Sequence, residues 1–156
     1  MIQATTELKS ELLWRAHIDV EGFYEVGHTF RGHRNIVRVK GGWFEGPKIK
    51  GKILPGTGDW FLTRPDGVGE GDVRDTYQTD DGAIIFVSYR GILNVSEDVW
   101  ARIRAGEDVP ASEYYLRGQP MFETGSEKYD WLNKIVSVSV GKQEAMGVTY
   151  DVFRIL

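Results

Sequence analysis

Apolar and polar residues alternate with a period of two along much of the chain, which predicts a protein built from β-strands. In residues 12–20 every second position is apolar, and Arg15, His17 and Asp19 occupy the positions between. Side chains of a strand point alternately to its two faces, so this pattern is typical of a half-buried strand. Residues 83–89, rich in β-branched and aromatic side chains, form the strongest strand candidate. Further extended segments are predicted at residues 35–44, 48–54, 59–63, 72–79, 113–124, 130–140 and 149–156.

Turn sequences separate these segments, and only one stretch has helical spacing. Residues 55–58, 64–67 and 80–82 combine Gly with Pro or Asp, residues that favour tight turns and hairpins. Gly41 and Gly42 predict a bend or bulge in the strand that they end. Residues 96–105 predict a short helix, because Val99 and Ile103 are four apart and Ser96 is suited to the N-cap.

The segment 130–140 bears on how the strands are arranged. One face would carry Leu132, Val136, Val138 and Val140, and the other Trp131, Asn133, Ile135, Ser137 and Ser139. A strand with one aliphatic face and one polar–aromatic face suits a wall between a packed layer and a lined cavity, although a strand in a sandwich core would look the same. We therefore expect residues 1–156 to form one all-β domain, an antiparallel closed β-barrel of about eight to ten strands with a central cavity and one short helix. A β-sandwich is the alternative.

Composition narrows the classes of function. The 19 glycines and 19 aromatic residues among 156 fit strands that bend and turn often. The absence of cysteine excludes disulfides, thiolate metal sites and a cysteine nucleophile, and the net charge of −4 argues against nucleic-acid binding. No segment approaches the roughly 20 apolar residues that span a bilayer, and the N-terminus has no signal-peptide pattern. We expect a cytoplasmic protein that binds neither membrane nor nucleic acid.

Asp59 and Trp60 are the first candidates for chemistry. They follow a Gly-rich turn, and a carboxylate beside a large ring in a partly dry pocket can act as a general base. The alternative is an aspartate that only caps a turn. Arg74, Arg90 and Arg117 lie in or beside predicted strands, where an inward guanidinium could hold a carboxylate or an enolate oxygen. Glu123 could pair with one of them, or these charges could lie on the surface.

Other motifs are missing. His17, His28 and His33 have no familiar metal-ligand spacing, so no metal is expected. The glycines at 56–58 and 67–71 lack the strand, helix and Lys-Ser/Thr context of a phosphate loop, and no Gly-x-Ser-x-Gly occurs. We expect no cofactor.

Several short motifs in a fixed order resemble the family designated domain of unknown function 3237. They are GGWFEGP at residues 41–47, LPG at 54–56, GDW at 58–60, RPDG at 64–67, TDDGA at 79–83, YYLR at 114–117, PMFET at 120–124 and YDWLN at 129–133. The resemblance covers roughly residues 12–156. It implies a small antiparallel β-barrel with a central cavity, often in a homodimer, and it implies no firm activity. It places Asp59, Trp60, Arg74, Glu123, Trp131 and Asn133 at motif positions, and the chain departs from it at residues 28–35 and at Asp75, where an aromatic residue is expected.

The sequence thus favours a cofactor-independent enzyme acting on a small carbonyl, enol or aromatic metabolite. Asp59 or Glu123 would transfer a proton, in isomerase, cyclase or lyase/hydratase chemistry. Arg74 and Asn133 would stabilise a developing oxyanion, and Arg117 would help to bind the substrate. Trp60 and Trp131 would exclude water and stack on the substrate. One alternative is a non-catalytic barrel that carries a small apolar ligand, and a weaker one is an interaction module that uses an exposed sheet face.

Overall fold

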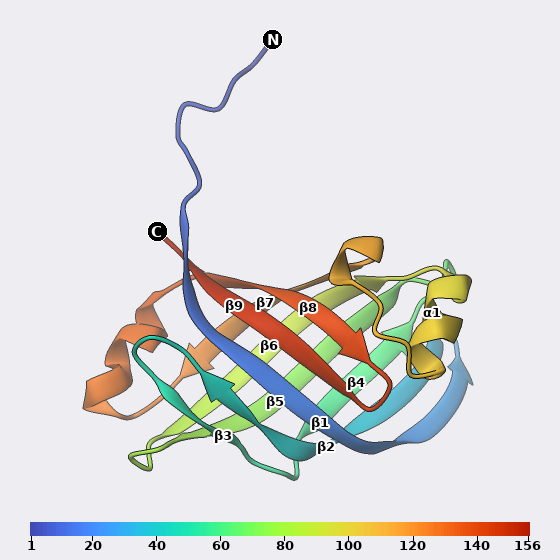
Figure 1. Ribbon diagram of the computed structural model, residues 1–156, viewed down its shortest axis with the longest axis horizontal. Coiled ribbons are helices and arrows are strands. Elements are labelled where there is room, and N and C mark those ends of the chain that lie inside the picture. The colour runs from blue at the N-terminus through green and yellow to red at the C-terminus, as the bar shows by residue number, and fades with distance from the viewer.

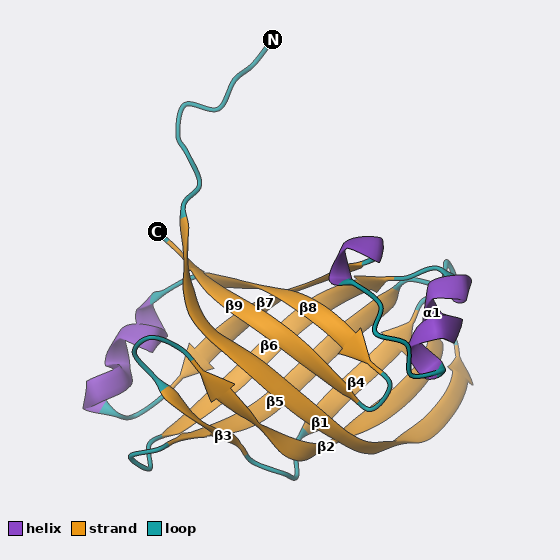
Figure 2. Ribbon diagram, viewed as in Figure 1, coloured by secondary structure: helices purple, strands orange, loops and turns teal.

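Nine strands, one α-helix and two short 3₁₀ helices make up the computed structural model, which describes residues 1–156 (Figures 1 and 2). The strands are β1 (Ser10–Thr29), β2 (Gly32–Glu45), β3 (Lys50–Ile53), β4 (Gly58–Thr63), β5 (Gly69–Thr79), β6 (Ile84–Asn94), β7 (Tyr115–Glu123), β8 (Ser137–Glu144) and β9 (Gly147–Ile155). The helices are α1 (Glu97–Arg104), η1 (Ala111–Glu113) and η2 (Glu127–Lys134). The chain is therefore all-β, with its one α-helix where the sequence predicts it.

The strands form one antiparallel sheet with barrel-like pairing. Its order runs β1-β9-β8-β7-β6-β5, and β5 pairs with both β3 and β4, which share the place between β5 and β2. Strand β2 then pairs with β1, so the pairings lead back to the strand where they began. This arrangement gives the sheet an inner and an outer face.

The alternation of side chains decides what each face carries. Along β5, Val73, Asp75, Tyr77 and Thr79 are buried, whereas Arg74 between them is exposed. The main core unites buried side chains from most strands, and it includes the ring pair Trp14–Phe44, whose centroids are 5.5 Å apart. Burial of this apolar surface is the main stabilising contribution to the fold.

Helical segments contribute buried side chains at both ends of the sheet. At one end, Val99 and Ile103 of α1 pack against Leu93 and Leu116, and at the other, Tyr129 and Leu132 of η2 join the main core. Figure 1 shows α1 and the orange η2 segment at opposite ends of the molecule. The middle of the sheet therefore lies between two covered ends.

Two strand predictions need correction. The predicted strand at 130–140 begins only at Ser137, because η2 occupies residues 127–134 and the Asn133 side chain binds the backbone of Thr124. The first strand does not end at Val20 but continues to Thr29, with register shifts where it passes Gly22 and Gly27. Gly27 has a φ of +91°, a conformation that suits glycine, so this glycine marks a bulge within β1 rather than the end of the strand.

Candidate functional site

Asp59 lies at the start of β4 on the inner face of the sheet. It is opposite Val37 of β2 and Val73 of β5, and directly paired residues share a face. Its Oδ1 accepts a hydrogen bond of 2.9 Å from the backbone N–H of Asp72. Burial raises the pKa of the Asp59 carboxyl to about 6, despite the opposing effect of that hydrogen bond. The side chain is thus an inward carboxylate that titrates near neutral pH.

A second inward carboxylate, Asp75 of β5, has no exposed surface. Its Oδ1 accepts a hydrogen bond of 3.0 Å from the Thr57 hydroxyl, and its Oδ2 has no partner. Burial raises the pKa of Asp75 to about 7, and the negative charge of Asp59 adds to the rise. Sequence reasoning treated Asp75 only as a departure from the family pattern. The available signal was its place between Val73 and Tyr77, every second residue of a predicted strand.

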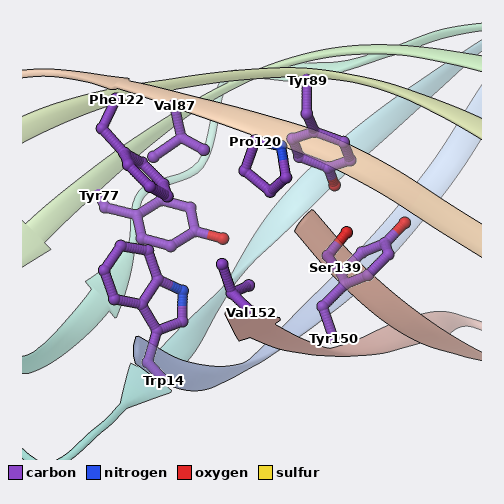
Figure 3. A pocket seen from close by; sticks show the side chains of 9 residues that line it. All are labelled: Trp14, Tyr77, Val87, Tyr89, Pro120, Phe122, Ser139, Tyr150 and Val152. Atoms are coloured by element: carbon purple, nitrogen blue, oxygen red, sulfur yellow. The ribbon is translucent and has the colours of Figure 1, made fainter. Parts of the chain in front are cut away.

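Aromatic side chains surround a small cavity on the same inner face (Figure 3). Its lining comprises Trp14, Tyr77, Val87, Tyr89, Pro120, Phe122, Ser139, Tyr150 and Val152. The room available to the centre of a water molecule is about 10 Å³, close to the minimum for one water. A cavity lined by rings and polar groups is therefore present, and it is far smaller than a metabolite.

Trp14 reaches this cavity because of a bulge. The register of β1 against β9 shifts between Leu12 and Trp14, so that Leu13 and Trp14 are both buried while Leu12 is exposed. Strict alternation would have placed Leu12 and Trp14 on one face. The indole Nε1 of Trp14 is buried without a hydrogen-bond partner, as is the hydroxyl of Ser139. An unpaired buried polar atom costs about 1–3 kcal/mol, so two of them beside one cavity call for an explanation.

The tyrosines of the cavity are held in their protonated form. Burial raises the pKa of Tyr77, Tyr89 and Tyr150 well above the usual value for tyrosine. The charge of Asp75 contributes to the shift of Tyr77, and the charge of Asp59 to that of Tyr150. The two carboxylates therefore act electrostatically on the tyrosine hydroxyls, which remain hydrogen-bond donors throughout the physiological pH range.

Two glycines keep the inner face open next to these groups. A Cβ on Gly71 would lie 3.5 Å from Asp59 Oδ2, and a Cβ on Gly118 would lie 2.8 Å from the Ser139 hydroxyl. Gly71 and Gly118 are each paired directly with Gly91, on the strand between them. A band without side chains thus crosses β5, β6 and β7 between Asp59 and Ser139.

Trp60 and Arg74 lie on the outer face, away from the cavity. The Arg74 guanidinium stacks 5.4 Å from the centre of the Trp60 ring, and the Arg74 side chain is 52% exposed. Each follows or precedes an inward aspartate in its strand, and neighbouring residues of a strand face opposite sides. The structure brings Asp59 and Asp75 together inside and leaves Trp60 and Arg74 outside.

The other predicted site residues also lie away from the cavity. Glu123 is exposed at the end of β7, and Arg117 donates to the Leu116 carbonyl and stacks over the Tyr115 ring. Asn133 and Trp131 lie on η2 at one end of the sheet, where Trp131 packs against the main core. The Asn133 amide binds both the N–H and the carbonyl of Thr124, a structural role. None of these side chains lines the cavity, and Asp59 and Asp75, although they lie on the inner face, are not among its lining residues either.

The structure offers no arrangement of three or more His, Asp or Glu side chains able to hold a metal ion. It also contains no helix with the length and apolar character needed to cross a membrane.

Comparison with known proteins gives consistent matches over nearly the whole chain. A UPF0311 protein of Rhodopseudomonas palustris (strain TIE-1) is 33% identical over 138 residues, 88% of each chain. The crystal structure of RPA1785 from Rhodopseudomonas palustris, a protein of unknown function, superimposes with a TM-score of 0.91 at 29% identity, covering 97% of this chain and all of that one. A β-barrel-like protein from Acinetobacter baumannii gives a TM-score of 0.85 at 32% identity, covering 98% and 99%.

A more distant structure shares the fold. An enzyme from Penicillium herquei superimposes over the full length of both chains with a TM-score of 0.73, at 21% identity. The family model described as protein of unknown function (DUF3237) matches residues 8–155. With nearly the whole sequence matched and the barrel-like architecture shared, the chain belongs to the DUF3237 family.

Proposed function

We propose that the protein is a cofactor-independent enzyme that transfers a proton on a small carbonyl, enol or aromatic metabolite, with Asp59 and Asp75 as the acid–base pair. The observation that carries the proposal is the presence of two carboxylates on one inner face, Asp59 partly exposed and Asp75 fully buried with an unpartnered oxygen. Neither carboxylate forms a salt bridge, although the charge of Arg34 acts on Asp59 and lowers its pKa. A buried carboxylate without a salt bridge destabilises a fold, so chemistry explains its presence better than stability does.

The environments of the two carboxyls divide the roles between them. Asp75 is the more deeply buried, and the charge of Asp59 favours its protonated form. Asp59 keeps some exposure and a backbone hydrogen bond that favours its ionised form. Burial raises the pKa of both carboxyls toward neutral pH, and the charge of one opposes ionisation of the other. We assign the base to Asp59 and the acid to Asp75, since a pair of interacting carboxyls can supply both roles.

The reaction follows from these roles. Asp59 takes a proton from carbon next to a carbonyl, the electron pair moves onto the carbonyl oxygen, and Asp75 returns a proton at a different atom. The outcome is isomerisation, cyclisation or elimination and addition of water, and no electron acceptor is required. Because the present cavity holds about one water, the wall of the sheet must move to admit a substrate.

The test is deuterium exchange in two carboxylate variants. Keto acids and phenols that raise the melting temperature would be incubated in D₂O with the protein, and exchange at carbon followed by NMR. We expect Asp59→Asn and Asp75→Asn to slow exchange by about 10²-fold or more, the usual contribution of a positioned acid or base. Asp80→Asn is the matched control. Asp80 is exposed in the turn that follows β5, so this variant should show deuterium exchange at the wild-type rate.

Wild-type exchange in both inward variants would contradict the proposal. Saturable binding of apolar compounds with no exchange in any form of the protein would instead support the carrier hypothesis. That hypothesis has a weaker basis, because the inner face carries carboxylates and unpartnered polar atoms rather than apolar groups alone.

A further inference from the structure

The polar groups that line the cavity are of an unusual kind for a protein core. Trp14 and Ser139 are each 1% exposed, and both have polar atoms without partners. In Figure 3 the indole nitrogen of Trp14 and the hydroxyl of Tyr77 turn toward the middle of the cavity, and the Tyr89 hydroxyl approaches from the other side. An indole N–H can only donate, so its missing partner is an acceptor.

The donors have the character of a site for an oxygen that carries negative charge. Burial and the charges of Asp59 and Asp75 keep Tyr77, Tyr89 and Tyr150 protonated at physiological pH, so their hydroxyls can donate, while the same two charges oppose a bound anion. Preorganised donors in a water-poor site stabilise an oxyanion more strongly than water does, because they need no reorganisation. The room of about 10 Å³ corresponds to one oxygen atom, whether of water or of a ligand.

The walls indicate what is attached to that oxygen. The Trp14 ring lies 5.0 Å from Phe122 and 6.2 Å from Tyr77, and the Tyr89 ring lies 5.6 Å from Tyr150. The rings of these pairs are inclined to one another by 48° to 74°, and aromatic walls of this kind favour a conjugated ligand that packs edge-to-face against them. Phe122 and Tyr150 are the partly exposed members of the lining, so displacement of these two rings opens the way in.

We propose that this cavity is an oxyanion-binding site for the enolate or phenolate oxygen of a planar conjugated ligand, with Trp14 Nε1 as its principal donor and the hydroxyls of Ser139, Tyr77 and Tyr89 as supporting donors. The inference rests on the proposed function, since it names the substrate class of the same interior. It also gives the unpartnered indole N–H a role: the ligand oxygen replaces a water and accepts its hydrogen bond.

The test compares 4-nitrophenol, whose ionised form is yellow, with nitrobenzene, which has the same ring and nitro group but lacks the phenolic oxygen. Calorimetry gives the affinities, and the visible spectrum reports ionisation of bound 4-nitrophenol. We expect wild-type protein to prefer 4-nitrophenol and to bind it as the phenolate. Trp14→Phe should weaken 4-nitrophenol binding about tenfold, as for loss of a hydrogen bond to a charged group, and should leave nitrobenzene affinity unchanged.

Ser139→Ala provides the second variant, because it removes only an unpartnered hydroxyl and should fold even if Trp14→Phe does not. It should weaken 4-nitrophenol binding by a smaller factor and spare nitrobenzene. Equal affinity for the two probes, no saturable 4-nitrophenol binding, or unaltered phenolate affinity in the folded variants would overturn the inference. Asp59→Asn separates the two proposals. If this variant still binds phenolate but has lost deuterium exchange, both proposals are supported. If the wild-type protein binds phenolate but shows no exchange activity, the oxyanion site is supported and the proposed function is contradicted.

Discussion

A single buried carboxyl, Asp75, ties the stability of this protein to pH. Its pKa is raised to about 7 in the folded state, compared with about 4 for an aspartate in an unfolded chain. Between these two values the native state binds more protons than the unfolded state. The free energy of unfolding therefore falls as pH rises from about 4, and the loss is complete once pH passes about 7.

Asp75→Asn should remove this dependence. Over three pKa units the loss in wild-type protein amounts to about 4 kcal/mol, and the variant should lack this part of the slope. Urea denaturation of both proteins at pH 4.5, 6 and 8 measures it, since comparison of the two cancels the titration of the carboxyls that do not interact with Asp75. Parallel stability curves would show that Asp75 ionises in the folded protein as readily as in water.

Individual site residues were only partly predictable from the sequence. The sequence predicts Asp59 as a candidate and it lies on the inner face, but Trp60 cannot share that face, because consecutive residues of a strand face opposite sides. The same rule places Arg74 outside once Asp75 is inside, so the alternation itself could have identified Asp75. Nothing in the local sequence, however, shows that the Asn133 side chain binds Thr124, because that contact joins residues nine positions apart through a folded turn.

Among the elements, the junction between β7 and β8 has the fewest backbone pairs. Only Arg117 with Val140 and Gly118 with Ser139 are in register, whereas β6 and β7 pair over nine positions. Beyond Gly118, Pro120 has no N–H to donate, and its carbonyl accepts a hydrogen bond of 2.5 Å from the Ser137 hydroxyl. At this junction a side-chain hydrogen bond thus replaces part of the backbone hydrogen bonding that joins the other strands.

Ser137→Ala should loosen this junction. It leaves the buried Pro120 carbonyl without that partner, which costs about 1–3 kcal/mol, and local opening should become more frequent. Hydrogen–deuterium exchange by mass spectrometry should show faster exchange at residues 119–124 and 136–139. Ser139→Ala is the matched control, since it lies on the same strand and loses no hydrogen bond; equal exchange in the two variants would argue that the Ser137 bond does not hold the junction.

The element scale was the most predictable, with two instructive exceptions. Period-two patterns and Gly/Asp turns predicted the hairpin at residues 80–82, where Gly82 has a φ of +91°, and the bend at Gly41, where the β1–β2 register shifts. The strand predicted at 130–140 was wrong in its first half, where the buried side chains Tyr129 and Leu132 are three residues apart, the period of a 3₁₀ helix rather than of a strand. Bulges escaped prediction in β1 because they change which residues face inward without changing strand content.

At the scale of the whole molecule, the homodimer implied by the family resemblance remains a prediction. Light scattering coupled to gel filtration should give a mass twice the 17.7 kDa of one chain. Measurement over a range of concentrations distinguishes a stable pair from a weak one. A mass of 17.7 kDa at every concentration would contradict the prediction.

Because α1 and η2 cover the two ends of the sheet, they affect the rate at which a bound ligand could leave the interior. If the proposed site binds a ligand, the ligand can leave only when the Phe122 and Tyr150 rings or the strands around them move, so its residence time depends on the rate of this opening as well as on its contacts. Product release would then limit the turnover rate of the proposed enzyme. Substitutions far from the carboxylates would change that rate if they changed how readily the surrounding sheet opens.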